Sequence, residues 1–208
     1  MNTVSPLLHA DAISIARGDS LLIEALSLSL HAGEALHVRG DNGAGKSTLL
    51  LALAGLIPIA DGTLEVEAEA LAFLGHDNGL MPDLTVAENL AVYAGSGISP
   101  DPATAQALGL DDLTDKPAKT LSFGQSRRVA LALTCLPEKA IWLLDEPFAG
   151  LDQQSAANLT GILVSALDAG TALVFSSHER SIEGATTLEW QVSSPPPFHT
   201  FEELPRLR

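Results

Sequence analysis

A chain of 208 residues with 46% hydrophobic residues and a mean hydropathy of +0.23 is long and apolar enough to bury one sizeable core. Its formal net charge is −15, and only 11 residues are Lys or Arg. This balance argues against a nucleic-acid partner, because phosphate backbones are bound by clustered basic side chains. The single cysteine, Cys135, excludes an internal disulfide and suits a reducing compartment.

The sequence predicts no membrane-spanning segment. Its first residues lack the positive and apolar regions of a signal peptide. The longest apolar run, residues 49–60, is shorter than the ~20 residues that a spanning helix needs. We therefore expect a cytosolic chain that reaches a membrane only through a partner.

Alternating apolar and polar residues precede the first glycine-rich segment and predict strands there. Residues 12–16, 26–30 and 35–38 alternate in this way, with a turn at 31–33. The pattern is typical of a half-exposed antiparallel sheet, which we expect to lead into the glycine-rich segment.

The glycine-rich segment itself has the pattern of a phosphate-binding loop, between a strand and a helix. Glycines let the backbone turn its N–H groups inward at a helix N-terminus, where unpaired donors and the helix dipole favour an anion. In this pattern Lys46 reaches the β- and γ-phosphates, and the Ser47 hydroxyl ligates Mg²⁺. We predict nucleotide binding here, with a structural Gly-rich turn as the alternative. The loop comprises Gly40, Asp41, Asn42, Gly43, Ala44, Gly45, Lys46, Ser47 and Thr48.

Short elements are predicted after this loop. The helix that begins at Lys46 is expected to end near Gly55, a residue suited to the position after a helix. Asp61-Gly62 predicts a turn, and residues 63–66 and 70–74 predict two short strands.

The middle of the sequence, from about residue 82 to residue 136, is mostly helical in pattern, with breaks at 95–102 and around Pro117. We interpret this block as a helical subdomain inserted into an otherwise α/β chain.

A Ser-x-Gly-Gln sequence lies at the start of one predicted helix in this block. Ser122 is placed to cap that helix, and capping alone is one interpretation. Together with Gly124 and Gln125 it is also a second potential anion site.

An apolar strand at 140–144 ends in two carboxylates, Asp145 and Glu146. A strand that is apolar on both faces suits the centre of a parallel sheet, whose carboxyl end is where α/β proteins bind ligands. Asp145 can hold Mg²⁺ through water, and Glu146 can polarise an attacking water. The alternative is a pair of solvent-exposed carboxylates at a strand end.

Asp152 follows Gly150 and Leu151, and this sequence is expected to open a helix that runs to about Ala169 and ends at Gly170. The next strand, 171–177, then delivers His178 to the edge that holds the carboxylates. A lone histidine is more often structural, but in this place it can donate to a γ-phosphate.

Taken in order, these elements resemble the nucleotide-binding subunit of an ATP-binding-cassette (ABC) transporter over nearly the full chain. The resemblance implies an α/β fold of the P-loop NTPase type, with a RecA-like core, an antiparallel β subdomain and an inserted helical subdomain. It also implies an ATPase whose cofactors are ATP and Mg²⁺. The family pattern covers the phosphate loop, the signature Leu-Ser-x-Gly-Gln, the Asp-Glu strand end, the Gly-Leu-Asp loop and the final histidine.

The resemblance further assigns roles to these residues. Two copies sandwich two ATP molecules, so that Lys46 of one copy faces Ser122, Gly124 and Gln125 of the other. Glu146 corresponds to the general base, His178 to the γ-phosphate contact and Asp152 to the loop that crosses the dimer.

Four departures from the family pattern are visible. His76 stands where most members have Gln, after the third strand, and Arg17 stands where many have an aromatic residue that stacks on adenine. Asp41 replaces a usual Pro, and Phe123 replaces a usual Ala or Gly in the signature.

The first two departures, together with residues 74–90 and 127–132, resemble the ATP-binding subunit of the haem exporter of bacterial cytochrome c maturation. That resemblance implies integral membrane subunits as partners and a peripheral location at the cytoplasmic face of the inner membrane.

Three alternatives remain at this point. An ABC ATPase for another substrate fits the same motifs. A soluble ABC ATPase of DNA repair or translation is disfavoured by the acidity and by the lack of heptads. A small-molecule kinase or GTPase would leave the signature unexplained, and the sequence has no Asn-Lys-x-Asp guanine motif.

We expect one ABC ATPase domain over residues 1–208. Its ATP-binding core is assigned to 1–81 and 137–194, and its helical subdomain to 82–136. Residues 195–208 form a tail with three successive prolines, for which the sequence indicates no function.

Overall fold

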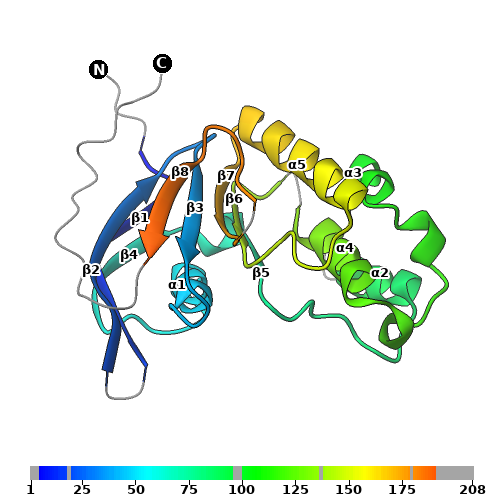
Figure 1. Ribbon diagram of the computed structural model, residues 1–208, viewed down its shortest axis with the longest axis horizontal. Coiled ribbons are helices and arrows are strands. Elements are labelled where there is room, and N and C mark those ends of the chain that lie inside the picture. The colour runs from blue at the N-terminus through cyan, green and yellow to red at the C-terminus, as the bar shows by residue number, and fades with distance from the viewer. Residues whose placement is uncertain (1–4, 18–19, 96–99, 136–137, 179, 191–208) are drawn as a thin grey trace.

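Two sheets and a set of helices make up the protein, whose computed structural model describes residues 5–17, 20–95, 100–135, 138–178 and 180–190 (Figure 1). In Figure 1 a three-stranded antiparallel sheet lies at one end of the molecule and a group of helices at the other, with a five-stranded parallel sheet between them. The expected tail at 195–208 lies outside the described residues.

The antiparallel sheet has the order β2-β1-β4. Its strands are β1 (Leu8–Arg17), β2 (Ser20–Leu30) and β4 (Asp61–Val66). Two alanines with positive φ, Ala12 (50°) and Ala25 (48°), lie near shifts in the β1–β2 register. A bulge of this kind changes the alternation of inward and outward side chains, so that Ile13, Ser14 and Ile15 are all buried.

The structure corrects two sequence-based expectations about this region. Residues 35–38, predicted in the antiparallel sheet, belong to the parallel one. Asp61-Gly62, predicted as a turn, forms the beginning of β4, paired with β1 through Ser14 and Asp61.

The parallel sheet has the order β5-β6-β7-β3-β8. Alternate residues along its strands enter two different cores, because successive side chains of a strand point to opposite faces. Ile141 and Leu143 belong to one core, whereas Trp142 and Leu144 belong to the other. The strands are β3 (Ala35–Gly40), β5 (Leu71–Leu74), β6 (Ile141–Leu144), β7 (Ala172–Ser176) and β8 (Thr186–Trp190).

Helices cover both faces of this sheet. The first core lies between the parallel sheet, α1 and the antiparallel sheet, and the second lies between the parallel sheet, α4 and α5. The α-helices are α1 (Lys46–Leu53), α2 (Val86–Gly95), α3 (Pro102–Ala107), α4 (Phe123–Thr134) and α5 (Gln153–Asp168). Short 3₁₀ turns occur at η1 (Ala68–Ala70), η2 (Asp111–Leu113) and η3 (Ala118–Thr120). The α/β class with an inserted helical block, predicted from the sequence, is confirmed.

Local signals set the helix ends. Gly55 and Gly170 have φ values of 69° and 96° and follow α1 and α5, as their sequence positions predict. Two helices of the middle block, α2 and α4, begin with a capping box. Thr85 and Glu88 exchange side-chain and backbone hydrogen bonds at the start of α2, and Ser122 and Gln125 do so at the start of α4. The Thr85 amide lowers the pKa of Glu88, since it stabilises the carboxylate.

Asn89 holds the chain before α2 against that helix. It is fully buried, its Oδ1 accepts from Met81 N at 2.7 Å, and its Nδ2 donates to Met81 O at 3.1 Å and Thr85 O at 2.9 Å. Its oxygen and both of its N–H groups therefore have partners, with Leu84 O more distant at 3.4 Å from Nδ2, and Asn89 fixes the local chain path.

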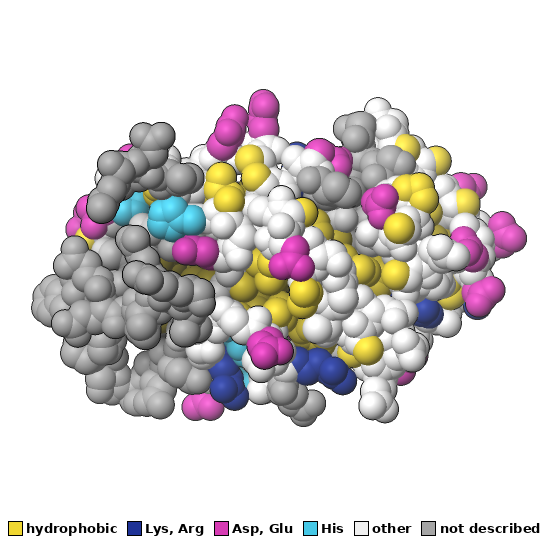
Figure 2. Space-filling view, turned by 90° about the horizontal axis from the view of Figure 1, so that it is seen from above, with side chains coloured by type: hydrophobic (Ala, Val, Ile, Leu, Met, Phe, Trp, Pro, Cys, Tyr) yellow, Lys and Arg dark blue, Asp and Glu magenta, His cyan; other side chains and the backbone are white. Residues whose placement is uncertain are grey.

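The surface is acidic, in keeping with the net charge. Figure 2 shows Asp and Glu side chains spread over the visible face, whereas Lys and Arg side chains are seen at only a few places. Among the described residues no helix has the length and apolar character required to cross a bilayer.

The single cysteine provides a test of the packing. Cys135 is 1% exposed at the end of α4, and burial raises the pKa of its thiol to about 12. The thiolate is the form that reacts with a disulfide reagent. At about pH 8 we therefore expect the native protein to react roughly a thousandfold more slowly than the unfolded protein. Reaction of the native thiol at the rate of the guanidinium-unfolded sample would contradict the buried position.

Candidate nucleotide-binding and catalytic site

The candidate site lies where four parallel strands end. β3 leads into the phosphate loop, β5 into residues 75–79, β6 into Asp145 and Glu146, and β7 into Ser177 and His178. Pairing of β3 with β7 and of β7 with β6 brings these ends to one edge of the sheet. Carboxyl ends of parallel strands are the usual place for ligands in such sheets.

The phosphate loop turns tightly before α1. Gly43 and Gly45 have φ values of 82° and 99°, which residues with a Cβ rarely adopt. Gly45 is the N-cap of α1. A Cβ on this residue would collide with the side chain of Leu22 in β2. Lys46 is buried, and its Nζ donates to the carbonyl oxygens of Gly40 at 2.7 Å and Asp41 at 3.0 Å. The ammonium is therefore held at the mouth of the loop.

His178 connects this lysine to Glu146. Its Nε2 lies 3.3 Å from Lys46 Nζ and 3.3 Å from Glu146 Oε1. An unprotonated Nε2 accepts from Lys46, whereas the 3.3 Å approach to Glu146 Oε1 is an ion-pair distance without hydrogen-bond geometry. Glu146 Oε1 is buried and has no partner of full hydrogen-bond geometry in the described part of the chain. The structure thus brings these three sequence-predicted residues together.

The backbone at Asp145 and Glu146 is fixed by β7. The hydroxyl of Ser176 donates to Asp145 Oδ1 at 2.7 Å and accepts from the Glu146 amide at 2.8 Å. Ser176 is fully buried, and Asp145 is 2% exposed. One hydroxyl therefore orients both carboxylate residues.

Oxygen ligands for a hard cation lie along one cavity. Ser47 and Asp145 line the same cavity of about 580 Å³, together with His76 and Asn78 of the loop after β5. A hydroxyl and a carboxylate are the ligands that Mg²⁺ takes alongside substrate phosphates and water, so the residues present fit this ion. His76 itself is exposed.

The signature residues lie at the start of α4 and contact the loop before α5. In the capping box the Gln125 amide donates to Ser122 Oγ at 3.2 Å, and the Ser122 amide donates to Gln125 Oε1 at 2.9 Å. A Cβ on Gly124 would collide with the carbonyl oxygen of Gly150, so the two backbones touch directly. The ring of Phe123 lies against Gly150 and is 48% exposed.

Asp152 caps α5, as its position before that helix predicts. Its Oδ1 accepts from the Ser155 amide at 2.7 Å, and this bond lowers the pKa of the Asp152 carboxyl. The structure therefore gives Asp152 a capping role within the chain. The side chain of Arg17, which the sequence placed where many family members have an adenine-stacking residue, lies outside the described residues.

Sequence reasoning missed the importance of Arg127 in α4. Its side chain is 1% exposed and donates to the backbone of both Asp145 and Glu146. The apolar run 129–133 indicates that one side of this helix is buried, but it does not separate Arg127 from Arg128, since both precede it.

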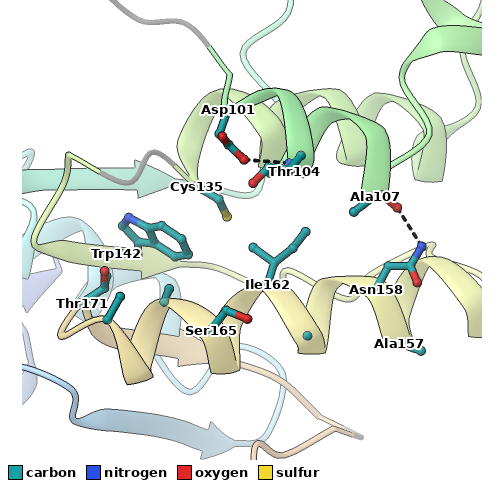
Figure 3. Close-up of a pocket in the computed structure, with 14 residues that line it drawn as sticks. Asp101, Thr104, Ala107, Cys135, Trp142, Ala157, Asn158, Ile162, Ser165 and Thr171 are labelled. Carbon is teal, nitrogen blue, oxygen red and sulfur yellow. Dashed lines mark hydrogen bonds between the residues drawn. The ribbon is translucent and has the colours of Figure 1, made fainter.

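A second, larger cavity lies away from these groups. It has a volume of about 700 Å³ and is bounded by α3, α5 and β6, with Trp142, Ile162 and Cys135 around it (Figure 3). None of the residues predicted as site residues lines it. Its lining combines alanines and larger apolar side chains with Asp101, Asn158 and three hydroxyl residues, and Asp101 and Asn158 bond to backbone groups of α3.

The comparisons with known proteins agree with this geometry. The family model described as ABC transporter matches residues 23–149. The chain belongs to the ABC transporter family. Proteins of this family bind and hydrolyse ATP, and this chain is one of its ATP-binding subunits.

Relatives within the ABC family cover most of the chain. The cytochrome c biogenesis ATP-binding export protein CcmA of Paracoccus denitrificans is 42% identical over 83% of this chain and 82% of its own length. The protein of the same name from Rhizobium meliloti is 40% identical over 88% of this chain and 96% of its own length.

Solved structures show the same ABC ATPase fold. An ATP-binding subunit of an ABC transporter superposes with a TM-score of 0.80 at 21% identity, covering 90% of this chain and 88% of that one. An ABC transporter ATP-binding protein from Pyrococcus furiosus gives a TM-score of 0.75 at 22% identity, with 88% and 96% covered.

The shared hydroxyl of Ser176 can be tested in this ABC subunit. Ser176→Ala leaves the buried Glu146 amide and an Asp145 oxygen without a partner, so we expect a loss of about 1–3 kcal/mol in the free energy of unfolding. We also expect ATP turnover to fall about tenfold or more, because the carboxylates lose their orientation. Denaturant unfolding and phosphate release measure the two effects.

Thr160→Val is the matched control, since it removes a hydroxyl whose bond, to Ala156 O at 2.9 Å, lies within α5. Equal turnover in the Ser176→Ala and Thr160→Val proteins would show that Ser176 does not orient the site.

Proposed function

We propose that this chain hydrolyses ATP between two copies of itself and uses the energy to drive integral membrane subunits of a haem exporter. The observation that carries the hydrolytic part is the position of His178 Nε2, 3.3 Å from both Lys46 Nζ and Glu146 Oε1. A cation for phosphate, a carboxylate for water and a histidine between them suit phosphoryl transfer to water.

The residues divide the work of this reaction. Backbone N–H groups of residues 40–48 and the Lys46 ammonium bind the phosphates. Ser47 and Asp145 would hold Mg²⁺, which neutralises charge on the β- and γ-phosphates when bound. Glu146 accepts a proton from water as the water oxygen attacks the γ-phosphorus, and the bond from that phosphorus to the bridging oxygen breaks, leaving ADP and phosphate. His178 donates to a γ-phosphate oxygen.

The second copy supplies the other half of each nucleotide site. Ser122, Gly124 and Gln125 of one copy face the phosphates bound by Lys46 of the other. Asp152 lies in the loop that crosses between copies, and His76 takes the place of the usual Gln after the third strand. The N-terminus of α4 supports this arrangement, since helix N-termini favour anions.

We assign the chain to haem export for c-type cytochrome biogenesis, at the cytoplasmic face of the bacterial inner membrane. The support is the name and near full-length similarity of the relatives described as cytochrome c biogenesis export proteins. We also propose the division into an ATP-binding core, 1–81 and 137–194, and a helical subdomain, 82–136. An ABC ATPase for another substrate is the alternative.

The dimer can be tested by size-exclusion chromatography of Glu146→Gln protein with and without ATP and Mg²⁺. Removing the base stops hydrolysis, so we expect ATP to shift the protein from monomer to dimer. Two further changes in this background separate capping from phosphate recognition. Ser122→Asn and Ser122→Asp both keep a good N-cap, but only Asp adds negative charge.

We expect Glu146→Gln with Ser122→Asn to retain the dimer and Glu146→Gln with Ser122→Asp to remain monomeric with ATP. Equal behaviour of the two double variants would mean that Ser122 acts as a helix cap only. A Glu146→Gln protein that stays monomeric with ATP would contradict the sandwich.

The haem assignment is tested in cells. In a bacterium that lacks the chromosomal copy, the plasmid-borne chain is expected to restore covalently bound haem in c-type cytochromes, measured by haem-peroxidase staining of gels. Lys46→Ala is expected to restore none, because it removes the phosphate-binding charge. Normal c-type cytochromes in the strain without the plasmid would contradict the haem assignment and leave the ATPase assignment intact.

A further inference from the structure

We propose that Arg127 is a positioning residue for ATP hydrolysis, which sets the backbone of Glu146 and ties it to the loop at residues 75–79. The inference rests on the proposed hydrolytic function. It extends that function to Arg127, whose hydrogen bonds within the described residues do not include the phosphate loop.

The two NH₂ groups of the Arg127 guanidinium donate to two different segments. Its Nη2 donates to the carbonyl oxygens of Asp145 and Glu146, the latter at 3.0 Å. Its Nη1 donates to Gly75 O at 2.8 Å and Asn78 Oδ1 at 2.9 Å. One planar group therefore bridges two segments that are far apart in the sequence.

The backbone that Arg127 holds is strained. Glu146 has φ of 48°, in the left-handed region that residues with a side chain seldom occupy. Such a conformation persists only where the surroundings fix it. Ser176 holds the Glu146 amide from β7, and Arg127 holds the Glu146 carbonyl from α4. Without Arg127 the peptide is fixed on one side only, and the Glu146 carboxylate loses its place beside His178.

Burying the charged side chain of Arg127 costs folding free energy, and only specific acceptors compensate for that cost. Arg127 is 1% exposed, and its Nε has no partner within the described ranges. Burial lowers the pKa of Arg127 to about 10, while the charges of Asp145 and Glu146 oppose that change. The guanidinium therefore stays protonated at neutral pH and keeps its donors.

The loop at the other side of Arg127 is held from a second helix as well. Tyr93 of α2 donates its hydroxyl to Gly79 O at 2.8 Å. His76 and Asp77 lie between these attachment points and are exposed. A displacement of this loop consequently acts on the Arg127 guanidinium and, through it, on the backbone of Glu146.

The chemistry requires arginine in this place. Its rigid fork offers two NH₂ groups with fixed directions, whereas a lysine ammonium concentrates its donors at one point. A glutamine has one NH₂ group and no charge, so it cannot serve both sides.

The test compares Arg127→Gln and Arg127→Lys with wild type, each purified together with its membrane subunits. We expect kcat for ATP hydrolysis to fall about 100-fold in Arg127→Gln, because displacement of a catalytic group by about 1 Å has an effect of that size. We expect KM for ATP to change less than about threefold, since the phosphate loop is untouched. We expect the kcat of Arg127→Lys to lie between those of wild type and Arg127→Gln. This variant provides the test if Arg127→Gln does not fold.

Asn158→Leu is the control for loss of side-chain hydrogen bonds away from the loop. Asn158 of α5 donates to Ala107 O at 2.7 Å and accepts from Gln154 Nε2 at 2.9 Å, and neither bond reaches residues 75–79 or the carboxylates. We expect Asn158→Leu to lower thermal stability and to leave kcat unchanged. A general structural role for Arg127 would instead make the Arg127 and Asn158 variants lose activity in proportion to stability.

A double-mutant cycle tests the connection to the loop. If Asn78 acts on turnover through Arg127, then Asn78→Ala lowers kcat in the wild-type background and has no further effect in Arg127→Gln. Additive effects would contradict the connection. Wild-type kcat in Arg127→Gln would overturn this inference alone, whereas a wild-type complex that hydrolyses no ATP would overturn the proposed function as well.

Discussion

The parallel register of β3, β7 and β6 is the constraint on which the site depends. Val38 pairs with Ser176, and Leu144 pairs with Phe175, so the three strands end at nearly the same level. The residues proposed to bind phosphate, metal and water then follow within a few residues of those ends. The register is itself held because both faces of the sheet are buried, and a shift by one residue would exchange the two cores.

Buried polar side chains add hydrogen bonds at the strand ends that the register brings together. Strand pairing brings Asp145, Glu146 and His178 near each other, but it does not orient their side chains. Ser176 bonds one Asp145 oxygen and the Glu146 amide, and Arg127 bonds the backbone carbonyls of both residues, through buried hydrogen bonds that are strongest where water is excluded. The geometry of the proposed catalytic site therefore depends on a buried polar network at the edge of an apolar sheet.

The parts of the fold that are encoded locally could be predicted from the sequence. Glycines after α1 and α5, the Ser122 cap and the carboxylates at the end of β6 each act within a few residues, and their positions are as expected. The choice of sheet for residues 35–38 could not be predicted, because it depends on pairing with β7 and β8, far along the chain.

The same reason explains why Arg127 was missed. Its acceptors come from residues 75–78 and 145–146, and no local pattern announces them. In the sequence it differs little from Arg128, which is half-buried and donates to Leu108 O instead. Burial of a charged side chain is decided by tertiary contacts, so the printed sequence alone does not separate these two neighbours.

The contact of Gly124 with Gly150 also determines where the signature of this chain can vary. Neither residue can carry a side chain without one backbone moving from the other or Phe123 moving aside. Position 123 is different, because its side chain lies over Gly150 with 48% of its surface in solvent. A bulky Phe is accommodated there within the chain, so a large side chain at position 123 leaves the contact between the Gly124 and Gly150 backbones intact.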